Sequence, residues 1–255
     1  MEAREEEMEQ PCWADMLPEA LAKIFSFLPL HDLLHSIPFI CSAWRKASLD
    51  AACWTHVDLS LWCCGKDTQT YSKMLSLVLN RSRGTLQQIV APNLIKDSML
   101  QMIACSGQSL QALQIRNSAL SEDCLCQLAP RFTALTYLDI RGRSFSSRAL
   151  VEAYGKHCPS IKKLALDIVE IRGGVGATSI ARIMPRLTHL ELCGSFSDTG
   201  LRALLENCLT LECLDLQGCW SITLKETTIL EARAKLKEFR LPAGENRKCP
   251  RLAVG

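Results

Sequence analysis

One short apolar pattern returns seven times along the last two thirds of this chain. The pattern L-x-x-L-x-L, with other apolar residues at some of its positions, begins at residues 86, 110, 135, 161, 187, 211 and 236. Neighbouring starts are 24 to 26 residues apart. A repeat at nearly constant spacing indicates stacked units, each of which contacts only its neighbours. The sequence therefore predicts a solenoid over residues 86–241.

Each unit contains the signals of one strand and one helix. The last two apolar positions of the pattern alternate with polar ones, which is typical of a short half-buried strand. A turn follows, and then a helix that begins near a capping residue such as Asp97, Ser121, or the pair Asp198 and Thr199. No unit can bury its apolar side alone, so we expect parallel strands on a concave face and helices on a convex face. The spacing is that of leucine-rich repeats.

One unit departs from this pattern. Residues 168–178 hold three glycines where the other units have a short turn. We expect a protruding loop between strand and helix there.

The chain has 14 cysteines but no C-x-x-C pair. Structural zinc sites usually use ligand pairs two to four residues apart, so the spacing disfavours zinc. We interpret most cysteines as small buried apolar residues. Cys158 and Cys208 fall at helix ends and Cys219 in a turn, whereas Cys193 and Cys213 fall at outward strand positions. No metal or cofactor is expected.

Charge and hydropathy limit the possible partners. The net charge is +2, which provides no overall field for nucleic acid or an anionic membrane. No apolar run reaches 18 residues, so no transmembrane helix is expected. Residues 1–12 are expected to be a disordered acidic tail, without the features of a signal peptide, and residues 242–255 a flexible tail. We expect a nuclear or cytoplasmic location, where thiols stay reduced.

Residues 13–53 do not follow the repeat and predict three helices. Pro18 suits the first position of a helix that Pro29 ends. Asp32 can cap a second helix, which Pro38 stops or kinks. Four apolar residues of the first helix fall at i, i+3, i+4 and i+7: Leu21, Ile24, Phe25 and Leu28. A third helix should include Ile40, Cys41 and Trp44 and end near Leu49.

Such a small helical unit cannot bury all its apolar surface, which implies a partner groove. After it, residues 54–85 are expected to be a capping strand and a linker. The strand should contain Trp54, Val57 and Leu59, which are spaced like a repeat strand.

The stretch "LPEALAKIFSFLPLHDLL…ICSAWRKASLDAACWTHVDLS" resembles an F-box. The resemblance lies in Leu-Pro at 17–18, Ile-Phe at 24–25, Ile-Cys at 40–41, Trp-Arg at 44–45 and a closing Trp54. With the repeats behind it, the chain from residue 13 to about 241 resembles the F-box/leucine-rich-repeat family, most closely its short plant members. The expected fold is α/β, a three-helix F-box followed by a leucine-rich-repeat solenoid.

The resemblance implies a function. Proteins of this family act as substrate-recognition subunits of Skp–cullin–F-box ubiquitin ligases, and other subunits perform the catalysis. The F-box binds the Skp adaptor, which leads to the cullin and RING subunits, and the repeats bind the target protein. The resemblance places adaptor contacts, or their direct support, at Leu17, Pro18, Ile24, Phe25, Leu28, Leu33, Ile40 and Trp44. Of these, we expect Ile24, Leu33 and Ile40 to be internal core.

Side chains alternate along a strand, so the third, fifth and seventh positions of each repeat should face the concave surface. Arg116, Arg141 and Lys163 would form a basic patch there. Beside it, Asp139, Glu191 and Asp215 would form an acidic column. We therefore predict a mixed-charge target-binding face comprising Arg116, Tyr137, Asp139, Arg141, Lys163, His189, Glu191, Cys213, Asp215 and Gln217.

Three other functions stay open at this point. Catalysis could be imagined for His189 with Glu191 or Cys193, but no nucleophile motif surrounds them. A small-molecule receptor resembling the longer plant hormone receptors would need many more concave cations. An F-box scaffold that acts outside the ligase is the third. Neither nucleic acid nor a membrane is expected as a partner, and the sequence does not name the target.

Overall fold

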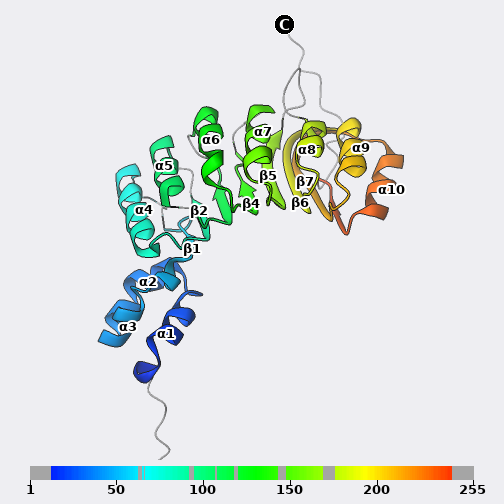
Figure 1. The fold of residues 1–255 in the computed structure, drawn as a ribbon. Helices are drawn as coiled ribbons and strands as arrows, with labels where there is room; N and C mark the ends of the chain where they lie inside the picture. The colour runs from blue at the N-terminus through cyan, green and yellow to red at the C-terminus, as the bar shows by residue number, and fades with distance from the viewer. Residues whose placement is uncertain are drawn as a thin grey trace, which may run out of the picture.

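A computed structural model describes residues 13–62, 65, 67–91, 95–106, 108–117, 120–142, 148–168 and 176–242. Both expected tails, apart from residue 242, and residues 169–175 of the expected glycine-rich loop lie outside the described residues. Figure 1 shows an arc of strands lined on its outer side by helices α4 to α10, with helices α1 to α3 at its N-terminal end.

The N-terminal part contains three short helices separated by 3-10 turns. They are α1 (Pro18–Phe25), α2 (Leu30–His35) and α3 (Ser42–Ala47), with turns η1 (Trp13–Asp15), η2 (Ile37–Phe39) and η3 (Ala51–Trp54). Pro18 is the first residue of α1, as expected. Asp32 does not cap α2: Pro29 holds the N-cap, and Asp32 lies in the first turn. Pro38 falls in η2, after α2 has ended.

Trp54 joins this part to the solenoid. Its side chain is fully buried, its indole Nε1 donates to the Ser48 carbonyl at 2.9 Å, and the Arg81 guanidinium lies 4.9 Å from its ring centre. Trp54 belongs to η3 and not to the strand in which the sequence placed it. The strand itself, β1 (His56–Asp58), pairs in parallel with β2 (Gln88–Ala91).

The segment expected to be a linker contains a long helix. It is α4 (Thr68–Ser82), capped by Asp67, whose carboxylate accepts from the Thr70 amide at 2.6 Å. Its buried face includes Tyr71, Leu75 and Val78, at helical spacing. Together with β1 it completes one more strand–helix unit before the first recognised repeat.

The recognised repeats form the rest of one eight-stranded sheet in which all strands are parallel and ordered β1 to β8. The strands are β3 (Ala112–Ile115), β4 (Tyr137–Asp139), β5 (Lys163–Ile168), β6 (His189–Ser197), β7 (Cys213–Thr223) and β8 (Glu238–Arg240). The helices are α5 (Asp97–Ser106), α6 (Glu122–Leu128), α7 (Arg148–His157), α8 (Ala177–Ile183), α9 (Asp198–Asn207) and α10 (Glu226–Lys235). A 3-10 turn, η4 (Ala129–Arg131), follows α6. The motif leucines of neighbouring units stand opposite one another and fill a single core.

Hydrogen bonds join the N-terminal ends of helices in neighbouring units. Ser121 caps α6, as expected, by accepting from the Cys124 amide. The cap of α9 is Ser197 and not the predicted Asp198 or Thr199. Asp198 accepts from the Lys225 amide of the next unit at 2.9 Å, much as Asp97 accepts from the Ser121 amide at 2.8 Å. These aspartates therefore hold consecutive repeats in register.

The structural role predicted for three cysteines is confirmed, although Cys219 lies within β7 and not in the predicted turn. Cys158, Cys208 and Cys219 are buried, and each thiol donates to a carbonyl of the preceding unit. Burial raises the pKa of Cys158 to about 12 and that of Cys208 to about 11, so both stay neutral thiols. In the described parts of the chain, no group of three potential metal ligands comes together, and no helix has the length and apolarity to cross a membrane.

Candidate functional site

Exposed apolar side chains gather on the N-terminal helices. Among the predicted adaptor contacts, Leu17 is 72% exposed, Ile40 56% and Ile24 40%, and Pro18 is also exposed. The expectation that Ile24 and Ile40 are internal core is therefore wrong, while Leu33 is buried as expected. We call Leu17, Pro18, Ile24 and Ile40, with the exposed Phe27 and Phe39, the F-box surface.

Phe25 is buried, and the geometry of α1 explains why. Its ring packs at 5.1 Å from that of Trp44, on the stripe that Leu21 and Ala22 also bury. Ile24 lies at the edge of this buried stripe, and its side chain is therefore exposed to solvent. Phe25 thus supports the F-box surface from inside, and the side chains of Leu28 and Trp44 are partly buried.

Two further aromatic residues, Phe27 and Phe39, belong to this surface, although the predicted adaptor contacts do not include them. Phe27 follows the end of α1, and Phe39 is the last residue of the 3-10 turn η2, so the periodicity of the α-helices assigns neither side chain to a face. Phe27 also borders a hollow of about 770 Å³ between the α1–α2 turn and β1, lined further by Leu28, Leu61 and Trp62. Only the folding together of distant segments creates this hollow.

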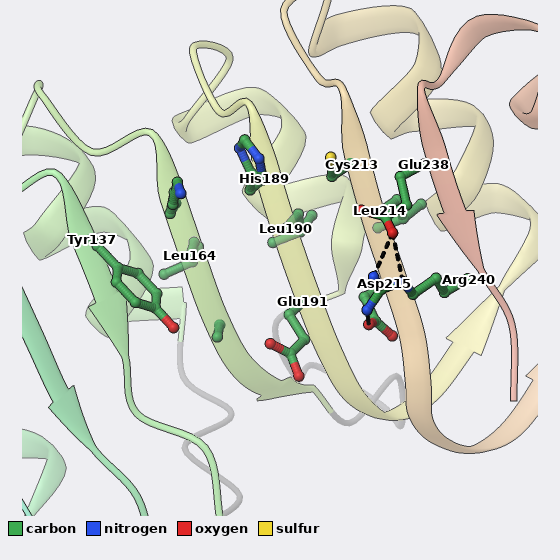
Figure 2. Close-up of a pocket in the computed structure, with 12 residues that line it drawn as sticks. Tyr137, Leu164, His189, Leu190, Glu191, Cys213, Leu214, Asp215, Glu238 and Arg240 are labelled. Carbon is green, nitrogen blue, oxygen red and sulfur yellow. Dashed lines mark hydrogen bonds and ion pairs between the residues drawn. The ribbon is translucent and has the colours of Figure 1, made fainter. Parts of the chain in front are cut away.

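The concave face follows the predicted alternation. Two rows of side chains cross its central and C-terminal strands, with members on neighbouring strands directly opposite one another. The first row is Tyr137, Lys163, His189, Cys213 and Glu238. The second row is Asp139, Ala165, Glu191, Asp215 and Arg240. Figure 2 shows several members of both rows around a shallow hollow of about 190 Å³.

Asp139 departs from its predicted role. It points to the concave side, but its carboxylate is completely covered and cannot contact a target. Arg116 donates to it at 2.7 Å, Arg141 at 2.8 and 3.0 Å, and the Tyr137 hydroxyl at 3.4 Å. Burial alone would raise the pKa of Asp139, but the hydrogen bonds and charges of Arg141 and Arg116 outweigh it and hold that pKa below its usual range. Asp139 is therefore the centre of a charge cluster and not a contact residue.

Arg141 reaches further across the sheet. Besides Asp139 on β4, its guanidinium pairs with Glu191 on β6. Ala165 stands on β5 between them and is almost fully covered, although its position is an outward one. A side chain as small as alanine leaves room for this ion pair to cross β5.

Most of the predicted basic patch and acidic column is therefore neutralised internally. Arg116 and Arg141 are both paired, and of the three predicted cations only Lys163 makes no ion pair within the described part of the chain. Since Lys163 is exposed, its charge is available to a partner.

At the C-terminal end of the two rows, carboxylates outnumber cations. Arg240 lies 3.4 Å from Asp215 and 2.8 Å from Glu238, as the dashed lines in Figure 2 mark. One guanidinium thus faces two carboxylates. Gln217 is exposed at the edge of this cluster, and its backbone amide donates to Asp215 at 2.8 Å.

Comparison with known proteins decides the family. The chain is 32% identical over 229 residues to F-box protein FBW2 of Arabidopsis thaliana, a match that covers 85% of this chain and 72% of FBW2. It is 31% identical over 216 residues to F-box protein SKIP19 of the same plant, covering 83% and 71%. This chain belongs to the F-box/LRR family. Arabidopsis F-box/LRR-repeat protein 9 is 29% identical over 228 residues, covering 83% of this chain and 89% of that protein. No protein-family model matches the chain.

The residues once considered for catalysis have other partners in this F-box/LRR protein. The Nδ1 atom of His189 lies 2.9 Å from the Thr188 hydroxyl, and Glu191 pairs with Arg141. Burial raises the pKa of the Cys193 thiol, which disfavours the nucleophilic thiolate. The same holds for Cys213, whose pKa is raised by partial burial and by Glu238.

Proposed function

We propose that this protein is the substrate-recognition subunit of a Skp–cullin–F-box ubiquitin ligase. In this proposal the F-box surface binds the Skp adaptor, and through it the cullin and RING subunits, while the concave face holds the target protein. Membership of the F-box/LRR family supports this role. The chain itself catalyses nothing: it raises the effective concentration of target lysines near the loaded ubiquitin-conjugating enzyme.

The observation that carries the proposal is the concentration of exposed apolar residues at one end of the molecule. Of the eleven large apolar side chains that are exposed in the described part of the chain, seven fall within residues 13–49. Contiguous exposed apolar surface on a small unit is typical of a protein interface. The convex and concave faces of the solenoid show no comparable cluster among the described residues.

The adaptor part of the proposal is tested by a double substitution. Leu17→Ala with Pro18→Ala removes two exposed side chains at the start of α1, neither of which makes a capping hydrogen bond. Burying a leucine contributes about 1.5–3 kcal/mol, so we expect a loss of affinity for the Skp adaptor of roughly tenfold or more. Co-purification and calorimetric titration with the adaptor measure this loss.

The matched control is Leu209→Ala. Leu209 is also highly exposed, but it lies between α9 and β7, far along the chain from the F-box. It should bind the adaptor like the unchanged protein. Circular dichroism should show both variants folded. Adaptor binding that survives the double substitution would contradict the proposed F-box surface.

The proposal includes a nuclear or cytoplasmic location. The ten described cysteines form no disulfide with one another, and five of them donate hydrogen bonds as buried thiols. Such a core suits a reducing compartment.

A further inference from the structure

Among the described residues, the first row of the concave face carries two charged side chains of opposite sign, Lys163 and Glu238, and their separation specifies a ligand. We infer that the first row binds an extended peptide segment carrying an acidic and a basic residue about four positions apart. The inference deepens the proposed function, since it describes the target that the concave face would hold. It rests on the charges, the register and the shape of the first row.

The positive end is Lys163, on β5. Its side chain is exposed, and no ion pair is formed by it within the described residues. Its nearest neighbours in the row are Tyr137 and His189, which stand opposite it in the strand register and carry no carboxylate. The other two cations of the predicted basic patch already form ion pairs. Arg116 pairs with Asp139, and Arg141 pairs with Asp139 and Glu191. An anionic side chain above β5 would therefore meet one free ammonium group.

The negative end is the pair of carboxylates around Arg240. Asp215 and Glu238 share this guanidinium, so one negative charge is left uncompensated. Glu238 belongs to the first row and is exposed. A neighbouring ion pair, Lys237 with Glu212 at 2.8 Å, is balanced and does not change this count. A cationic side chain above β8 would therefore find a carboxylate.

Between the two ends lie two members of the row that carry neither a carboxylate nor an ammonium group, His189 and Cys213. Both are partly exposed, and they line the hollow that Lys163 and Glu238 border on either side. Figure 2 shows His189, Cys213 and Glu238 in succession on β6, β7 and β8. The hollow is open to solvent and its volume is about 190 Å³, so it suits a chain lying across the strands and not an enclosed small molecule.

The strand spacing sets the separation of the charges on the ligand. Neighbouring strands lie about 4.8 Å apart, so the three steps from β5 to β8 span roughly 14 Å. An extended peptide advances about 3.4 Å per residue, so roughly four residues cover the same distance. The curvature of the solenoid brings side-chain ends closer together on this side, so an offset of three to five fits.

A peptide series tests the inference on the full chain. The probes are fluorescent peptides of serine and alanine that contain one glutamate and one arginine, offset by one to eight positions in both orders. Anisotropy should show the tightest binding at offsets of three to five, in one order of the two charges, and weaker binding at high salt. Lys163→Glu should weaken the best peptide by roughly fivefold or more.

The decisive variant exchanges both charges, Lys163→Glu with Glu238→Lys. It should prefer the opposite order of glutamate and arginine at the same offset. The control, Lys156→Glu on the convex helix α7, makes the same change in net charge as Lys163→Glu and should leave binding unchanged. Absence of an offset preference, or an order that the exchange does not reverse, would overturn the inference.

The same preparations are tested for binding of the Skp adaptor. Retained adaptor binding with no peptide preference overturns the inference and leaves the proposed function standing. If the unsubstituted protein does not bind the Skp adaptor, the proposed function itself is overturned, whatever the peptides show.

Discussion

At the scale of single residues, the concave face depends on one buried carboxylate. Asp139 occupies a position that alternation assigns to the surface, yet two arginines and a tyrosine cover it. A buried ion pair adds little net stability compared with an apolar replacement, but removing one partner leaves the others uncompensated. The cluster fixes where Arg116 and Arg141 can reach and so leaves Lys163 as the available cation.

We predict that Asp139→Asn destabilises the protein by about 3–5 kcal/mol at pH 7, because Arg141 keeps its buried charge without its main partner. The folded-state pKa of Asp139 is lowered, so its contribution is present above the unfolded pKa of about 3.9 and is lost as pH falls through the folded value. The variant should therefore differ most from the unchanged protein near neutral pH and least in strong acid. Urea unfolding across this range measures the difference.

The matched control for this substitution is Asp123→Asn in the first turn of α6. Asp123 is exposed and interacts with the helix end, which contributes about 1 kcal/mol or less. Equal losses of unfolding free energy for the two variants at pH 7 would show that Asp139 contributes no more stability than an exposed carboxylate.

At the scale of elements, β5 and β6 meet at one position without space for a side chain. Gly194 of β6 has φ of +122°, and a Cβ there would stand 2.0 Å from the Ile168 carbonyl oxygen on β5. The obstacle is backbone, which cannot rotate away as a side chain does. A glycine is therefore required for β5 and β6 to stay paired over their full length.

We predict that Gly194→Ala costs at least about 2 kcal/mol more stability than Gly84→Ala. Gly84 also has a positive φ, +80°, but a Cβ there would meet nothing within 4 Å. Both variants carry the conformational strain of a left-handed residue, roughly 1–2 kcal/mol, so the comparison isolates the backbone clash. Midpoints of chemical unfolding measure it, and equal midpoints would contradict the close approach of the two strands.

At the scale of the whole molecule, a single continuous core runs from the F-box into the solenoid. Trp54 stands at the junction, where it contacts the F-box through Ser48 and the first helix of the solenoid through Arg81. In a stacked array each unit depends on its neighbours, so the first unit needs a cover for its exposed end. The F-box supplies that cover, and it is thereby held in a defined position relative to the concave face.

We predict that Trp54→Ala costs about 3–5 kcal/mol and lowers hydrogen-exchange protection in both α1 and α4, because the lost ring packs against both sides of the junction. Trp220→Ala is the control: its side chain is 57% exposed, and its removal should change stability little. Loss of protection confined to the F-box would show that the two parts fold independently.

The repeat spacing and the F-box resemblance predicted the main architecture from sequence alone. The period of 24 to 26 residues placed all seven later strands, because an apolar pattern of that regularity can be buried only by stacking. The same reasoning assigned Cys158, Cys208 and Cys219 to the core. It did not find α4: the spacing of Trp54, Val57 and Leu59 predicted a strand before residue 86, but the segment after this strand was predicted to be a linker.

What the sequence by itself determined was which residues face outward, because strand alternation is a local property. What only the tertiary structure decided was which outward residues are available. Asp139 is covered because Arg116 comes from the neighbouring strand, and Ala165 because Arg141 and Glu191 meet above it. Ile24 and Ile40 are exposed because Phe25 and Trp44 fill the F-box core first. These outcomes depend on contacts between segments distant in sequence, and local periodicity carries no information about them.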